Sequence, residues 1–138
     1  MREILFRAYD TYTKTMLPVV DAIKFTKSES INIIRDGAYG VAVTIPYQPH
    51  IELMQYTGLK DKNEKEIYEG DILQDSDCVY EVIFEYGCFD VKVIKVLKNV
   101  GTQKGMTYQL SFIISDNDNI KVIGNIYENL NLLEKENK

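Results

Sequence analysis

Two adjacent segments of alternating character constrain the fold of this chain more than any other feature. In CVYEVIFEY, residues 78–86, every second side chain is apolar or aromatic, as in a strand that buries one face. Gly87 permits a turn, and FDVKVIKVLK then supplies the β-branched residues that strands favour. The pair predicts a β-hairpin that turns at Tyr86-Gly87. The face predicted to be buried consists of Tyr80, Val82, Phe84 and Tyr86.

Further short strands are expected on both sides of this hairpin. Alternation before a turn signal marks Glu3–Tyr9, Ile31–Ile34 and YGVAVTIPY. The same pattern returns in YQLSFII, after the loop NVGTQKG. Several short strands separated by turn residues predict a mainly β protein of the sandwich or barrel type.

Helical spacing is scarce in the sequence. The segment VVDAIKF shows it weakly near Val19. Residues 125–134 show it better, with Ile126, Leu130 and Leu133 on one side. We therefore expect a short C-terminal helix that packs these three side chains against the β structure.

The bulk properties fit a single cytosolic protein. A chain of 138 residues suffices for one core. The opening MREILFRAYD lacks the apolar run of a signal peptide, and no segment is apolar enough to span a bilayer. The net charge of −5 weighs against bulk binding to nucleic acid, because phosphate contacts dominate such binding.

The two cysteines are predicted to be free thiols. In the expected hairpin, Cys88 lies beside the turn and Cys78 lies far along the other arm. A disulfide requires Cα atoms within about 7 Å, so this placement excludes one. Two cysteines and a single histidine, scattered along the chain, do not form a zinc spacing, and we expect no metal or cofactor.

A second hairpin is predicted from LMQYTGLKDKNEKEIYEGDIL, residues 53–73. Asp61 to Lys65 form a polar turn between its two arms. Gly58 and Gly70 lie inside the arms, where glycine marks a bulge or the close approach of another backbone. Small barrels bend their strands at such points, so EGDIL is typical of a strand that enters an SH3-like barrel.

The same stretch identifies a family. YTGLKDKNEKEIYEGDIL closely resembles the central signature of the YopX family, small proteins of bacteriophages and prophages. REILFRAYD followed by Met16 resembles the opening of that family, and VIGNIYENLNLL resembles its closing segment. The positions taken as the family signature, with a structural role, are Tyr56, Thr57, Gly58, Leu59, Asp61, Ile67, Tyr68, Gly70, Asp71, Gly124 and Asn125.

Three positions depart from the family pattern. Glu64 stands where the family usually has glycine, which puts a tight turn with positive φ in question there. Tyr9 replaces a common tryptophan and keeps an aromatic anchor. Leu130 replaces a proline that often follows the asparagine, so the last helix is expected to start earlier than in relatives.

What the resemblance implies is limited. It implies a β-rich fold with an SH3-like portion, a phage setting and no established enzymatic activity. It supplies no catalytic residues. We therefore expect a protein that is not an enzyme.

The chain contains three candidate sets of catalytic groups: the carboxylates near residue 70, His50 and Cys88. Glu66, Glu69 and Asp71 could form a carboxylate set, since Glu69 and Asp71 share one face of a strand. No base or metal cluster accompanies them, so we interpret them as turn and barrel-entry carboxylates. His50 is interpreted as an exposed loop residue without catalytic partners. Cys88 has no neighbour that would lower its pKa, so we interpret it as a small buried hydrophobe.

The aromatic residues offer a binding hypothesis. Exposed aromatic side chains such as Tyr80, Phe84 and Tyr86 could stack bases or grip peptides, but the alternation favours a core role for this face. In a strand, Lys95 points away from Lys92 and Lys98, which leaves too few lysines for a basic groove.

These considerations give three functional hypotheses. The leading one is a non-enzymatic protein-binding or assembly module of a phage or prophage in the host bacterial cytoplasm, with host or phage protein partners and a homo-oligomeric state. The alternative is a nucleic-acid-binding accessory factor with a local basic patch. The third is a hydrolase built on Glu69 and Asp71.

The predicted architecture is an SH3-like small barrel with additional N-terminal strands and a short C-terminal helix. Residues 1–50 are assigned to the N-terminal β extension. Residues 51–138 are assigned to the barrel with its closing helix, or the two form one continuous domain.

Overall fold

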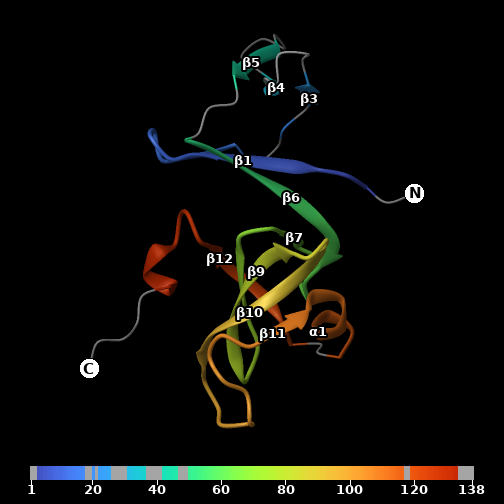
Figure 1. The fold of residues 1–138 in the computed structure, drawn as a ribbon, viewed down its shortest axis with the longest axis vertical. Coiled ribbons are helices and arrows are strands. Elements are labelled where there is room, and N and C mark those ends of the chain that lie inside the picture. The colour runs from blue at the N-terminus through green and yellow to red at the C-terminus, as the bar shows by residue number, and fades with distance from the viewer. Residues whose placement is uncertain are drawn as a thin grey trace. The chain divides into compact units, whose positions relative to one another are not determined.

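A computed structural model describes residues 3–17, 20, 22–25, 31–36, 42–46, 50–116 and 119–133 (Figure 1). The chain is mainly β, with antiparallel sheets, one of them a half-barrel, and a short helix, which confirms the predicted fold class. Its residues group into two units, Ile4–Gln55 and Tyr56–Lys138 with Met1–Glu3. The boundary falls inside strand β6 (Ile51–Lys60).

The unit Ile4–Gln55 begins with a hairpin of β1 (Phe6–Asp10) and β2 (Thr15–Leu17). β1 also pairs with the first half of β6. Ala8, Val20 and Ile51 form its small buried cluster. A separate three-stranded sheet contains β3 (Ala22–Phe25), β4 (Ile31–Asp36) and β5 (Ala42–Pro46).

The weak helical prediction for VVDAIKF is wrong for the residues of this segment that form β3. Ala22 to Phe25 pair along their whole length with β4, where Ala22 lies opposite Ile34. The apolar run of β4 offers a complete ladder, and such pairing outweighs a weak local periodicity. Val19, on which the helical spacing was centred, lies outside the described residues.

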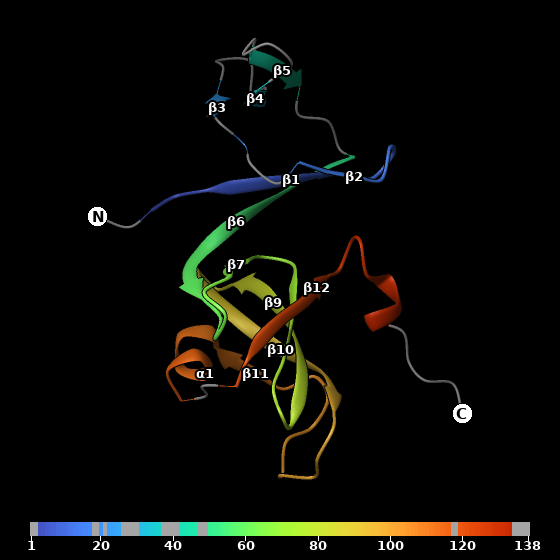
Figure 2. The same cartoon turned by 180° about the vertical axis from the view of Figure 1, so that it is seen from behind.

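The unit Tyr56–Lys138 holds the barrel strands. The second half of β6 pairs with β7. Five strands then form one sheet in the order β11-β10-β9-β8-β12, so that β12 returns from late in the chain to lie beside β8 (Figure 2). The strand bounds are β7 Glu66–Tyr68, β8 Asp71–Gln74, β9 Cys78–Glu85, β10 Cys88–Val96, β11 Thr107–Gln109 and β12 Lys121–Asn125.

One face of the five-stranded sheet carries the core of this unit. Burying each of its aliphatic side chains stabilises the fold by about 1.5–3 kcal/mol. Cys78 belongs to the core, Cys88 is half-buried beside the hairpin turn, and both are free thiols, as predicted. The core residues are Ile67, Leu73, Cys78, Tyr80, Val82, Val91, Val93, Leu110 and Ile120.

The strand predicted for YQLSFII is mostly wrong. Only its first residues belong to β11, and a helix α1 (Leu110–Asp116) follows directly. Leu110, Ile113 and Ile114 recur at the spacing of one helical face, and all three pack on the core. In the part of the chain that the structure describes, no helix has the length and apolar character required to cross a membrane.

The predicted C-terminal helix is a single 3-10 turn, η2 (Leu130–Leu132). The prediction that Leu130 packs against the barrel is wrong, because this side chain is 60% exposed. Asn125 does cap one turn: its side-chain oxygen accepts the backbone N–H groups of Tyr127 and Glu128, and its carbonyl accepts that of Asn129 (3.0 Å). This turn does not continue as an α-helix, and only the 3-10 turn η2 follows it.

An irregularity in β10 changes the placement of its lysines. The register places Lys92 opposite Glu81 and Lys95 opposite Val79, with a bulge between Val93 and Lys95. Glu81 and Val79 are two residues apart on β9 and therefore share a face. The extra residue thus places Lys92 and Lys95 on the same face, and the prediction that Lys95 points away from Lys92 is wrong.

Candidate functional site

The centre of the family signature is a turn organised by one carboxylate. Oδ1 of Asp61 accepts the backbone N–H groups of Asn63 (2.8 Å) and Lys65 (3.0 Å), and its Oδ2 accepts that of Val122 (2.9 Å). Burial pushes the pKa of Asp61 up, but these N–H groups and Lys65 outweigh it and hold the pKa below the ordinary 3.8. Asp61 therefore fastens the β6–β7 turn to the edge strand β12.

The replacement of the family's usual glycine by Glu64 at the turn tip does not change the backbone conformation. Glu64 adopts φ +63°, the left-handed conformation that glycine would adopt freely. Its N–H donates to the carbonyl of Asp61 (3.0 Å), which holds the turn closed. The tight turn with positive φ is therefore present at position 64, although the residue there is not glycine.

The arms of the signature hairpin are fixed in the same manner. The hydroxyl of Thr57 donates to the carbonyl of Ile67 (2.7 Å) across β6 and β7, beside the positive φ of Gly58. Gly70, also at positive φ, donates to the carbonyl of Val82 (2.9 Å) and accepts from Ile126 (2.9 Å). The positive φ at both positions, +84° for Gly58 and +85° for Gly70, is the backbone conformation that favours glycine.

The closing segment of the family has its own structural network. The N–H of Asn125 donates to the side chain of Asn129 (3.1 Å), which packs directly over Gly124. A Cβ on Gly124 would lie 2.5 Å from Oδ1 of Asn129. In the described structure, Gly124 and Asn125 thus make local contacts that hold the turn after β12.

The carboxylates considered for catalysis are held by structural contacts. Asp71 is buried and accepts the backbone N–H of Tyr68 (2.8 Å). Oε2 of Glu66 accepts the Tyr68 hydroxyl (3.2 Å), and the ring of Tyr68 lies 5.6 Å from that of Tyr56. Glu69 is half-buried and also interacts with another group of the protein. Among the described residues, no group of three or more His, Cys, Asp or Glu could hold a metal ion.

His50 and Cys88 are placed in ordinary surroundings. The His50 ring stacks on Tyr12 at 4.1 Å, so it is half-buried and not fully exposed as expected. Cys88 is also half-buried, and its thiol donates to Asp90 (3.4 Å). That hydrogen bond, with burial and the charge of Asp90, raises the pKa of Cys88 and disfavours the nucleophilic thiolate.

Asp75 was missed by sequence reasoning. It is buried, and its Oδ1 accepts the N–H groups of Asp77 and Cys78 (both 2.8 Å). Its Oδ2 accepts the hydroxyl of Tyr80 (2.9 Å), and burial together with this bond raises the pKa of Tyr80 well above its usual range. The sequence signal was the Asp-Ser-Asp turn before a strand.

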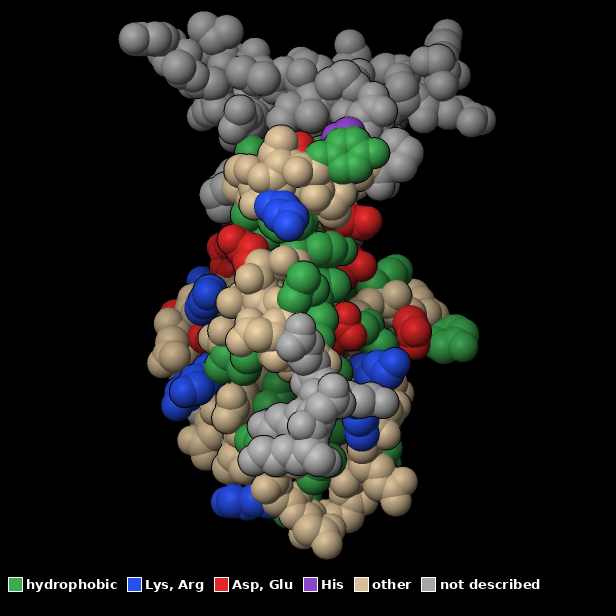
Figure 3. Space-filling model, turned by 90° about the vertical axis from the view of Figure 1, so that its left-hand side faces the viewer, with side chains coloured by type: hydrophobic (Ala, Val, Ile, Leu, Met, Phe, Trp, Pro, Cys, Tyr) green, Lys and Arg blue, Asp and Glu red, His purple; other side chains and the backbone are tan. Residues whose placement is uncertain are grey.

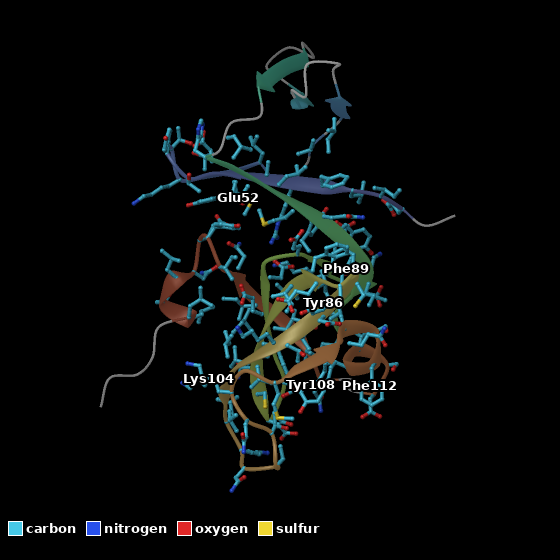
Figure 4. All side chains as sticks on the ribbon, viewed as in Figure 1. Glu52, Tyr86, Phe89, Lys104, Tyr108 and Phe112 are labelled. Atoms are coloured by element: carbon cyan, nitrogen blue, oxygen red, sulfur yellow. The ribbon has the colours of Figure 1, made fainter. Side chains whose placement is uncertain are left out.

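The hairpin of β9 and β10 carries the clearest surface feature. The prediction that its aromatic face is core holds for Tyr80 but is wrong at the hairpin end. Phe84 is 50% exposed and Tyr86 is 99% exposed, and the ring of Phe89 meets that of Phe84 edge-on at 5.0 Å. We call Phe84, Tyr86 and Phe89 the aromatic tip; Figure 4 shows the last two at this hairpin.

The surroundings of the aromatic tip are acidic. Glu85 lies next to Tyr86 on β9, and Asp90 follows Phe89 on β10. Elsewhere charges of both signs are mixed, as the face drawn in Figure 3 shows. Because successive strand residues point to opposite faces, these carboxylates lie on the other face of the hairpin from Phe84 and Phe89, so the tip itself offers a partner exposed apolar area.

Comparisons with known proteins agree with this architecture. The chain is similar to a solved structure, protein EF1440 from Enterococcus faecalis, with 31% identity over 97% of this chain and 100% of that chain, at a TM-score of 0.62. No curated protein matches the chain. The family model of the YopX protein matches residues 5–134, nearly the whole chain. The chain therefore belongs to the YopX family.

Proposed function

We propose that this protein is a non-enzymatic protein-binding module that presents the aromatic tip to a host or phage protein. The phage or prophage setting and the host bacterial cytoplasm are parts of the same proposal. The feature that supports it is the combination of full exposure and an unfavourable backbone conformation at a single aromatic residue, Tyr86.

The backbone conformation at position 86 suits other residue types better than tyrosine. Its φ is +51° and that of Gly87 is +79°, as the two central residues of a type I′ hairpin turn require. Non-glycine residues other than Asn and Asp rarely adopt this conformation, which costs about 1–2 kcal/mol. Because the ring is 99% exposed, it recovers almost none of that cost by burial. Strain of this kind, when observed, motivates a functional hypothesis.

Two further side chains make the tip a surface suited to binding. Phe84 and Phe89 form an edge-on pair directly below Tyr86 on the two strands of the hairpin. Aromatic side chains supply much of the binding energy in protein interfaces, and a rigid hairpin loses little entropy when it binds.

A site-specific crosslink tests the proposal. A photo-reactive phenylalanine analogue is placed at Tyr86 in tagged protein, in infected or prophage-induced cells. The matched control has the same analogue at Phe112, which is 58% exposed on α1 (Figure 4). We expect one discrete protein adduct from position 86 that is missing from position 112. Equal adducts from both positions, or none from position 86, would contradict the proposal.

Association of copies of this chain is proposed separately. Small barrels with exposed apolar side chains and short edge strands often self-associate. A homo-oligomer formed through the tip would give an adduct of twice the chain mass in the same experiment, which makes the two partners distinguishable.

A further inference from the structure

A methionine side chain holds the loop between β10 and β11. The sulfur of Met106 accepts two hydrogen bonds, from the backbone N–H of Gln103 (3.2 Å) and from the hydroxyl of Tyr108 (3.7 Å). In return, the N–H of Met106 donates to the carbonyl of Gln103 (3.2 Å). Gln103 and Met106 therefore close a turn together, and one of its two bonds depends on a thioether, which is a weak acceptor.

This turn is joined directly to the sheet. The N–H of Val93 donates to the carbonyl of Met106, and the N–H of Gly105 donates to the carbonyl of Val93 (both 2.8 Å). Strand β11 begins at the next residue, Thr107. Figure 4 labels Lys104 and Tyr108, which precede and follow Met106 in the chain. A chemical change at the sulfur of Met106 would therefore act where the loop meets the edge of the sheet.

Met106 is the most accessible methionine of the described residues. It is 41% exposed, and the residues on both sides of it, 103–105 and 107, are exposed as well. In contrast, Met54 is only 2% exposed, and Met16 is half-buried on β2. An oxidant dissolved in water must reach the sulfur before it can react, so it meets Met106 first.

We propose that Met106 is a reversible oxidation site whose modification opens the β10–β11 loop, with a peroxide as the oxidant. A lone pair of the sulfur attacks one oxygen of hydrogen peroxide, an S–O bond forms as the O–O bond breaks, and the other oxygen leaves as water once the proton has been transferred. The sulfur loses two electrons and the peroxide gains them. The product is methionine sulfoxide, which methionine sulfoxide reductases return to the thioether.

Oxidation removes the acceptor on which the turn depends. A thioether sulfur has two lone pairs, and in this loop two donors face it. The new oxygen occupies one lone pair and leaves the sulfur with a partial positive charge, so the N–H of Gln103 no longer has an acceptor there. The side chain also changes from apolar to polar. We expect the turn between Gln103 and Met106 to open as a result.

Treatment of the full chain with hydrogen peroxide, at a concentration that leaves its circular dichroism unchanged, tests both steps. Peptide mass spectrometry should show that Met106 gains one oxygen at least about ten times faster than Met54. Amide hydrogen exchange followed by NMR should then show the N–H of Gln103 exchanging several-fold faster. Reduction by the two methionine sulfoxide reductases, one for each sulfoxide epimer, should restore the original exchange rate.

Two variants separate the effect at Met106 from general oxidative damage. Met106→Leu keeps an apolar side chain but has no acceptor, so its Gln103 amide should exchange rapidly from the start and should not respond to peroxide. Met16→Leu is the matched control, because it removes another methionine and leaves the loop intact. Its Gln103 amide should respond to peroxide as in the unaltered protein.

The opposite results are equally specific. Oxidation of Met54 or Met16 as fast as Met106 would overturn the choice of site. Unchanged or slower exchange at Gln103 in the oxidised protein would overturn the effect on the loop, because the sulfoxide oxygen would then have replaced the sulfur as acceptor. Failure of the reductases to restore the exchange rate would overturn the claim that the modification is reversible.

Discussion

Replacing Tyr86 with asparagine is expected to stabilise the protein while it removes the proposed contact. Asparagine adopts positive φ far more readily than tyrosine, and Asn-Gly is the preferred pair for a type I′ turn. The native φ values at positions 86 and 87 are +51° and +79°. Of the 1–2 kcal/mol cost of this conformation, asparagine should recover about 0.5–1 kcal/mol.

Loss of buried area opposes this gain in stability very little. Tyr86 is 99% exposed, so the substitution forfeits almost no buried area. Equilibrium urea unfolding followed by circular dichroism should show the midpoint rising by about 0.3–0.7 M for a slope near 1.5 kcal/mol/M. Thermal unfolding should shift upward by roughly 2–5 °C.

The control is Tyr86→Phe, which keeps both the ring and the strained backbone. It should leave stability unchanged. If Tyr86→Asn proved neutral or destabilising while Tyr86→Phe was neutral, the ring would be making contacts in the folded chain. The reasoning that assigns Tyr86 to a partner would then be refuted.

Further predictions concern the signature network and the state of association. Asp61→Ala should cost about 3 kcal/mol of unfolding free energy, because it leaves three backbone N–H groups without their charged acceptor. Since the pKa of Asp61 is lowered on folding, its contribution should be complete above about pH 4 and be lost as the pH falls further, which a pH series of urea midpoints would show. Gly124→Ala should cost about 1–3 kcal/mol by collision with Asn129, and the double variant with Asn129→Gly should regain part of that loss in the same assay. Light scattering on a sizing column should show more than one copy per particle; a monomer at all concentrations would contradict the predicted homo-oligomer.

The two central hairpins followed from local patterns that the fold did not override. The hairpin at Tyr86-Gly87 turns where alternation and glycine placed it, and Cys78 and Cys88 are free for the geometric reason given. The turn at Asp61 was likewise readable from its polar residues. What the sequence could not supply was the long-range partner of Asp61, the N–H of Val122.

Two of the failures share one physical cause, which is dependence on residues far along the chain. Alternation marked Phe84 and Tyr86 as core, but the core ends before the hairpin does, and strand length alone does not show where. Lys92 and Lys95 share a face only because β10 carries a bulge in its pairing with β9. The helix at Leu110 was hidden because apolar residues at positions 110, 113 and 114 fit both a buried strand and a helix.

The most direct test of the central proposal is affinity purification of the tagged protein from infected or prophage-induced cells, with nuclease treatment in parallel. The account predicts a protein companion that survives nuclease and accompanies the unaltered chain and Phe112→Ser. The same companion should be lost from Tyr86→Asn, although that variant is at least as stable. A companion retained equally by Tyr86→Asn, or one that disappears with nuclease in every sample, would contradict the assignment of the aromatic tip as a protein-binding surface.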